Sequence, residues 1–181
     1  MRIHGPNLKR LAGDKGVEPE RLAEAVQRTG LKGANAVRAV SNWMRDNDHP
    51  RCKASDIGKM AEVLGVESSK IARFECILKY QKGSPRKAKL LTDLIRGKDV
   101  LTAENLLRFN TKRAAVGVFK ALKAAIADAE QAQADATALV VCDSRVDGGP
   151  VMKRIKEKDR GRAHPILKPF SHITVALEER V

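Results

Sequence analysis

The chain has 181 residues, enough for one ordinary domain or two small ones. Hydrophobic residues make up 43% of it and aromatic residues only 3%, so any core must be built mainly from Leu, Ile, Val and Ala. The 35 Lys and Arg outnumber the 22 Asp and Glu, and the resulting net charge of +13 attracts polyanions. Nucleic acid is therefore the leading partner, although an anionic membrane surface or an acidic protein could use the same charge.

Several classes of protein are excluded by what the sequence lacks. No apolar run approaches the roughly 20 residues that a membrane-spanning helix needs, and no secretory leader is recognised. Cys52, Cys76 and Cys142 are odd in number and far apart, so we expect neither a disulfide framework nor a metal site, and a reduced, cytoplasmic compartment. No Gly-rich phosphate loop or nucleophile motif occurs, so we expect no catalytic residues, no cofactor and no enzyme activity.

Residues 1–75 are predicted to form an all-helical N-terminal extension without strands. Apolar residues at helical spacing predict helices over residues 20–28 and 34–44. Ser55 is expected to cap a third helix that ends at Gly65, and a short fourth helix is expected over residues 68–74. This segment carries 14 basic and 10 acidic side chains, whereas residues 76–181 carry 21 and 12.

Residues 76–181 are predicted to form an α+β domain. A short β-compatible stretch precedes Ser84, which is expected to cap a helix with Pro85 in its first turn and Gly97 at its end. A shorter helix is predicted over residues 101–107, and a long one after Thr111. Apolar runs near the C-terminus then predict strands and a long hairpin over about residues 137–177.

The middle of that hairpin is strongly basic. Residues 152–168 contain seven Lys and Arg and almost no apolar side chains with which to build a core. A two-stranded ribbon is marginally stable by itself in water. The segment therefore makes physical sense only if it is inserted into something negatively charged.

Ordered blocks over about a hundred residues carry a resemblance to a known family. They begin with Ser84-Pro85-Arg86-Lys87 and continue through residues 93–98, 107–109, 112–115 and 123–130. They end with residues 146–150, 153–154, 161–163 and Ser171-His172-Ile173-Thr174-Val175. In this order and spacing, they resemble the large-subunit ribosomal protein that is numbered twenty-two in the universal nomenclature.

The resemblance implies three helices on a small antiparallel sheet with a protruding hairpin, and a structural role in the large ribosomal subunit. It implies binding and assembly of ribosomal RNA, contact with neighbouring ribosomal proteins, and a hairpin tip near the nascent chain in the polypeptide exit tunnel. The expected location is the cytoplasmic ribosome, with an organellar ribosome as the alternative.

Carried over by position, the resemblance implies a set of RNA contacts made largely by cations. The positions are Ser84, Arg86, Lys87, Arg96, Lys98, Lys112, Arg113, Lys153, Arg154, Lys156, Lys158, Arg160, Gly161, Arg162, Lys168 and His172. Near the tip the chain departs from the family pattern, because Glu157 and Asp159 place two carboxylates there. Either the tip faces water, or neighbouring cations neutralise these carboxylates.

Residues 1–75 lie outside that resemblance and are loosely similar to a repressor-type helix-turn-helix domain. In that interpretation the helix over residues 34–44 would face nucleic acid. The contacts it would offer are Lys32, Asn35, Arg38, Asn42 and Arg45. Two functions follow from the two halves: a ribosomal RNA-binding protein with a helical extension, or, as the alternative, a DNA-binding transcription regulator.

Overall fold

The computed structural model of the chain describes residues 1–180, which fall into two compact units. The first unit holds residues 1–74, residues 128–139 and the described residues from Leu177 onward. The second unit holds residues 75–127 and 140–176. Residues from both ends of the chain therefore meet in the first unit. The predicted division into an N-terminal extension of residues 1–75 and a domain of residues 76–181 stays a prediction.

The first unit is mainly helical and contains the buried side chain of Trp43. Its elements are β1 (Arg2–Ile3), α1 (Gly5–Asp14), α2 (Pro19–Ala25), α3 (Ala34–Met44), α4 (Ala54–Leu64) and the 3₁₀ helix η1 (Ser68–Ile71). Trp43 is fully buried and donates its Nε1–H to the Pro50 carbonyl at 2.7 Å. Leu8, Leu22 and Ile57 are fully buried with it. The low aromatic content thus leaves aliphatic side chains to complete this core.

The start of α1 is held by contacts from distant parts of the same unit. His4 precedes the helix, and its Nδ1 accepts a hydrogen bond from the Asn7 backbone N–H at 3.3 Å. Its Nε2 lies 2.9 Å from a carboxylate oxygen of Glu178. The Gly5 N–H donates to the Asp46 carboxylate at 3.2 Å. The helix is therefore fixed both to the residues after α3 and to the C-terminal strand.

A buried carboxylate organises the region before α4. Asp56 is 2% exposed, and its Oδ2 lies 2.7 Å from Arg28 Nη1. The same oxygen accepts the Lys53 backbone N–H at 3.0 Å, which satisfies a donor at the start of α4. Cys52 is buried beside this cluster and donates its backbone N–H to Asp48 at 2.7 Å.

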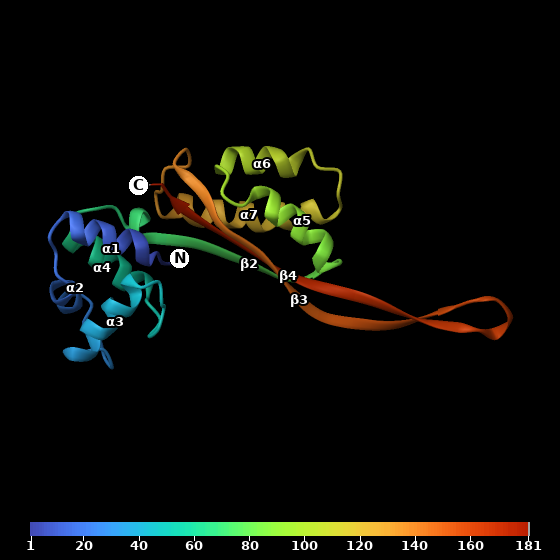
Figure 1. Cartoon of the computed structure of the whole chain (residues 1–181), viewed down its shortest axis with the longest axis horizontal. Coiled ribbons are helices and arrows are strands. Elements are labelled where there is room, and N and C mark those ends of the chain that lie inside the picture. Colours follow the sequence, from blue (N-terminus) through green and yellow to red (C-terminus); the bar gives the residue numbers. More distant parts are fainter. Residues whose placement is uncertain (181) are drawn as a thin grey trace. The chain divides into compact units, whose positions relative to one another are not determined.

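The second unit combines three helices with the long strands (Figure 1). Its helices are α5 (Pro85–Ile95), α6 (Val100–Arg108) and most of α7 (Ala114–Gln131). The strands that contribute to it are β2 (Ala72–Lys82), β3 (Leu139–Glu157) and β4 (Ala163–Glu179), with the 3₁₀ turn η2 (Asp159–Gly161) between the last two. The four strands are ordered β1-β2-β4-β3, and β1 is antiparallel to β2, with Arg2 opposite Arg73.

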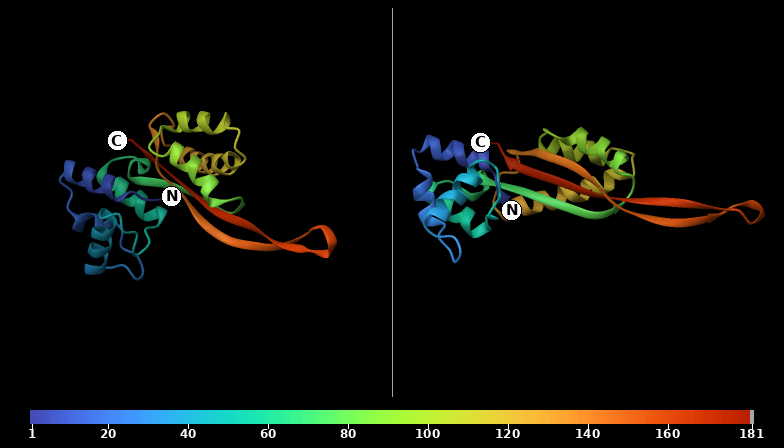
Figure 2. Two further views of the ribbon diagram at one scale, coloured as in Figure 1. Left: turned by 45° about the vertical axis from the view of Figure 1, so that its right-hand side comes forward. Right: turned by 60° about the horizontal axis from the view of Figure 1, so that its bottom comes forward.

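The β3–β4 hairpin has an inner half with a core and an outer half without one. At the inner end Val141, Ile173 and Val175 are fully buried. All residues from 150 to 165 except those of the turn itself are strand, and every residue in this range is exposed. Figures 1 and 2 show this outer half extending away from α5, α6 and α7. The predicted α+β class and protruding hairpin are thus confirmed.

Most of the helices were predicted, but α1 was not, and the helix ends and short strands were predicted less well. The helix over residues 34–44 and the left-handed Gly65 after α4 are confirmed. The absence of strands from the first 75 residues was wrong, because β1 exists and β2 begins at Ala72, inside the expected fourth helix. Ser55 lies inside α4, which Lys53 precedes, and α7 begins at Ala114, three residues after Thr111. No helix within residues 1–180 is long and apolar enough to cross a membrane.

We expect the Gly5→Ala substitution to destabilise the first unit. A Cβ on Gly5 would lie 2.4 Å from the Trp43 carbonyl oxygen and 2.5 Å from the Asp46 nitrogen, both backbone atoms. Such overpacking costs about 1–3 kcal/mol or more. Gly13→Ala in the same helix is the matched control, because nothing lies within 4 Å of its Cβ and alanine favours helix by about 0.5–1 kcal/mol. The stability of both variants can be measured by urea unfolding, followed by the fluorescence of Trp43, the single tryptophan. Equal unfolding midpoints for the two variants would contradict the close packing at Gly5.

We expect Cys52 to resist alkylation in the native protein. Burial, followed by the negative charges of Asp56 and Asp48, raises the pKa of its thiol to about 12. Since the thiolate is the nucleophile, iodoacetamide at pH 8.5 should modify Cys52 only after urea unfolds the chain, as mass spectrometry would show. Because the folded-state pKa is raised, this group's contribution to stability is complete below about pH 9 and is lost between about pH 9 and 12. Rapid native labelling of Cys52 would contradict its burial.

Candidate nucleic-acid interface

Two helices of the second unit, α5 and α7, have basic residues at or just before their first turn, a position where acidic residues are usually favoured. Ser84 precedes α5 without a side-chain capping hydrogen bond, and Arg86 and Lys87 occupy the first turn. Lys112 and Arg113 immediately precede α7, and neither helix has an acidic residue in its first turn. The helix dipole places partial positive charge at these ends, so the added cations are unfavourable by themselves. An anion held at both ends would relieve that repulsion.

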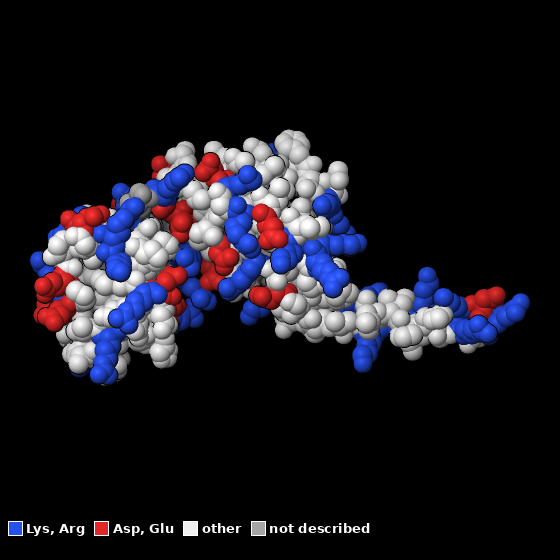
Figure 3. Space-filling model, viewed as in Figure 1, with Lys and Arg blue, Asp and Glu red and all other residues white. Residues whose placement is uncertain are grey.

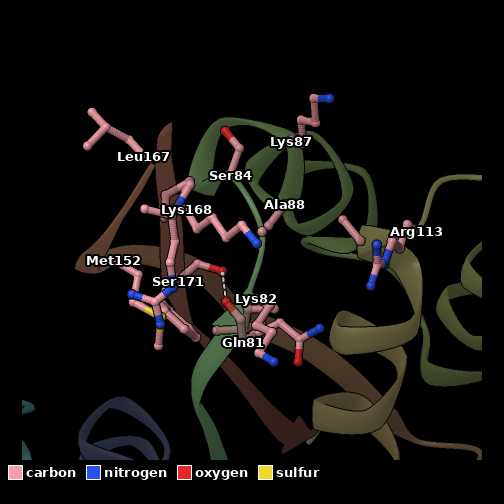
Figure 4. A pocket seen from close by; sticks show the side chains of 16 residues that line it. Gln81, Lys82, Ser84, Lys87, Ala88, Arg113, Met152, Leu167, Lys168 and Ser171 are labelled. Carbon is pink, nitrogen blue, oxygen red and sulfur yellow. Dashed lines mark hydrogen bonds between the residues drawn. The ribbon is translucent and has the colours of Figure 1, made fainter. Parts of the chain in front are cut away.

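Both helix starts border one cavity of about 720 Å³ (Figure 4). Its walls come from β2, α5, α7 and the two hairpin strands, and five of its lining residues are cations: Lys82, Lys87, Arg113, Arg154 and Lys168. No carboxylate lines it. Figure 4 shows the Lys168 side chain crossing the cavity toward Ala88, whereas the Lys87 side chain points outward. The cavity is therefore electropositive from several directions.

The strands that form the cavity floor are held in register by polar contacts. Ser171 Oγ donates to the Gln81 carbonyl at 3.4 Å, drawn as the dashed line in Figure 4. The Gly83 N–H donates to the Pro169 carbonyl at 3.2 Å. A Cβ on Gly149 would lie 3.1 Å from the Phe170 backbone, so the glycine permits close approach of β3 and β4. The hairpin base thus has a defined geometry onto which the cations are fixed.

The structure brings together five residues predicted from the sequence and one that was missed. Ser84, Lys87, Arg113, Arg154 and Lys168 all line the cavity. Lys82 joins them from the end of β2. Its position only two residues before Ser84 was the signal available in the sequence.

Arg96 and Lys98 lie at the other end of α5, outside that cavity. The Arg96 guanidinium donates to the Ser144 carbonyl and lies 3.4 Å from the Asp93 carboxylate. The Lys98 carbonyl accepts from the Val141 N–H at 3.0 Å, which joins this turn to β3. Both residues are exposed, so their charges stay accessible to a ligand although each residue also makes a hydrogen bond to β3.

The outer hairpin presents its cations along an exposed ribbon (Figure 3). Lys153, Lys156, Lys158, Arg160 and Arg162 are all exposed. At the tip the Lys158 N–H donates to the Arg162 carbonyl at 2.7 Å, and Arg160 and Gly161 have positive φ. Asp159 accepts the Arg160 backbone N–H at 2.9 Å. The carboxylate of Asp159, one of the two at the tip, is therefore hydrogen-bonded to the backbone of its own turn.

His172 is held against Tyr80 rather than in the cavity. Its Nδ1 accepts the Tyr80 backbone N–H at 3.1 Å, and the two rings meet edge to face with centroids 4.9 Å apart. Tyr80 has a φ of 56°, a conformation that is strained for an aromatic residue. The imidazole therefore satisfies a backbone donor at an unusual bend in β2.

In the first unit, three of the five predicted contacts lie on one stripe of α3, and Arg45 continues this stripe just past the end of the helix. Asn35, Arg38, Asn42 and Arg45 recur at three- and four-residue spacing, opposite the buried face that contains Trp43. Lys32 is exposed just before the helix. Asn42 also donates its side-chain amide to the His49 carbonyl at 2.9 Å, so it contributes to the fold of the following turn.

The fold and charge of the second unit define a class: a small α+β domain with a protruding basic hairpin and an electropositive cavity at its base. Residues 76–178 match the family model described as Ribosomal protein L22p/L17e. The chain therefore belongs to this family, a class of ribosomal structural proteins rather than of enzymes.

Curated relatives support the assignment over the same part of the chain. The large ribosomal subunit protein uL22 of Syntrophotalea carbinolica is 46% identical over 104 residues, which cover 57% of this chain and 94% of that protein. The uL22 of Magnetococcus marinus is 52% identical over 100 residues, covering 55% of this chain and 88% of that protein. The uL22 of Caldicellulosiruptor saccharolyticus is 42% identical over 114 residues, covering 62% and 93% respectively.

Proposed function

We propose that this protein is a structural constituent of the large ribosomal subunit that binds ribosomal RNA through the cavity and hairpin of its second unit. The observation that carries the proposal is the cavity lined by five cations and no carboxylate, at the starts of two helices and the base of the hairpin. Phosphates entering it would meet side-chain cations and backbone N–H groups together.

The hairpin supplies the second part of the mechanism. Its inner half is anchored by buried apolar residues, and its outer half is an exposed cationic ribbon. Inserted between RNA segments, such a ribbon neutralises phosphates on both of its edges and holds the segments in register. We propose that its tip reaches the polypeptide exit tunnel and the nascent chain, and that neighbouring ribosomal proteins contact the globular part on a cytoplasmic ribosome.

The salt dependence of RNA binding tests this mechanism. Replacing Arg113 or Lys168 with Gln should weaken binding to a large-subunit ribosomal RNA transcript and lower the slope of log K against log salt by about one for each phosphate that the variant no longer neutralises. Lys120→Gln is the matched control, since it removes the same charge from an exposed position on α7 that does not line the cavity. Unchanged slopes for both cavity variants would refute the cavity as a phosphate site.

The α3 stripe supports a second candidate function for the first unit, as a nucleic-acid surface. Among the described residues, Lys32, Arg38 and Arg45 form no ion pair, whereas nearby Asp46 and Asp56 are paired with arginines. If this surface reads DNA as a transcription regulator, the full-length chain should prefer one sequence by a factor of at least about 10³ among competing duplexes, and Arg38→Ala should abolish that preference. Equal binding to all duplexes, with Arg38→Ala weakening them uniformly, would exclude the regulator and leave a sequence-independent RNA contact.

A further inference from the structure

The ring of Phe109 is exposed to an extent unusual for its type. Its exposed fraction is 81%, the largest among the exposed large hydrophobic side chains of residues 1–180. Burying a phenylalanine side chain stabilises a protein by about 1.5–3 kcal/mol, so the fold forgoes that gain here. Phe119, in contrast, is partly buried and carries the Lys123 ammonium 5.2 Å from its ring centroid. No ring contact of this kind involves Phe109 among the described residues.

The backbone presents the Phe109 ring from a fixed turn. The Phe109 N–H donates to the Asn105 carbonyl at 3.1 Å at the end of α6. The Asn110 N–H donates to the Leu107 carbonyl at 3.3 Å, and Asn110 Oδ1 accepts the Lys112 N–H at 3.0 Å. The Ala115 N–H then donates to the Lys112 carbonyl at 2.8 Å as α7 begins. The ring therefore extends from a hydrogen-bonded connection rather than from a loose loop.

The charged residues nearest Phe109 in the sequence are basic. Residues 105–113 include Arg108, Lys112 and Arg113, all exposed, and no acidic residue. The nearest carboxylate along the chain, Glu104, lies 3.5 Å from Lys123. Arg113 is also one of the cavity cations. An apolar protein pocket that covered Phe109 would have to desolvate these cations, whereas a nucleic acid offers a base for the ring and phosphates for the charges.

We propose that Phe109 is a stacking platform for an unpaired base of RNA, and that the phosphates flanking this base reach Arg108, Lys112 and Arg113. The proposal rests on the RNA-binding function above and adds a contact that is neither electrostatic nor dependent on base identity. A base paired within a duplex cannot expose its face to the ring, so the site selects single-stranded RNA, a bulge or a loop.

The experiment compares full-length variants on two RNA probes: a 15-nucleotide single strand of mixed sequence and the corresponding 15-base-pair duplex. Phe109→Leu should lower affinity for the single strand about tenfold, within the roughly 5- to 150-fold range of one aromatic–base stack, and leave the duplex unaffected. The slope of log K against log salt should not change, because the variant neutralises as many phosphates as the wild type. Phe109→Trp should retain affinity, and its added indole fluorescence should be quenched by the single strand, since Trp43 is fully buried.

Leu101→Ala is the matched control, because Leu101 is an apolar side chain that is 60% exposed on α6, with the acidic residues Asp99 and Glu104 within three positions of it in the sequence. Equal loss of affinity for single strand and duplex, or no loss with Phe109→Leu, would overturn the stacking role. Normal RNA binding by Phe109→Leu together with reduced incorporation into large subunits would overturn it in favour of a protein contact. Failure of the RNA-binding function itself is distinguishable, because the wild-type chain would then bind neither probe.

Discussion

The main physical constraint on the second unit is the clustering of positive charges that have few acidic partners nearby. Cations occupy two helix starts, a cavity without carboxylates and an exposed ribbon. Like charges gathered this closely repel one another, and the helix dipoles add to that repulsion. The buried aliphatic side chains around Leu91, Leu122 and Ile173 hold the unit together against this cost. Binding a polyanion removes the repulsion, so the strained charge distribution of the isolated chain becomes favourable in the complex.

Many of the helices could be predicted from the sequence because the patterns that specify them are local. The apolar spacing along residues 34–44 specifies both the helix and its buried face, and Pro85 after Ser84 marks the start of α5. The cations of the cavity were found by resemblance, position by position. Lys82 was missed because its role depends on β2 lying next to the hairpin strands, a long-range pairing that no local pattern encodes.

The errors have the same origin. α1 was not predicted, since Gly5, Pro6 and Gly13 give its sequence a poor helix propensity. It forms because Leu8 and Leu11 are buried by tertiary packing and because His4 and Asp46 satisfy donors at its start. Residues 72–74 were assigned to a helix, but they belong to β2, in which Ala72 and Arg73 pair with β1. In each case a partner distant in the sequence decided the local structure.

The first unit is built from segments that are far apart in the sequence, and this affects the order in which it can fold. His4 is paired with Glu178, and the Arg180 N–H donates to the Ala138 carbonyl within the same unit. A ribosome synthesises α1 well before the end of β4, so α1 lacks this partner until the later strand has been made. During that time the unit lacks its final strand and the buried Leu177 that the strand supplies. Completion of the first unit therefore depends on the synthesis of the end of β4.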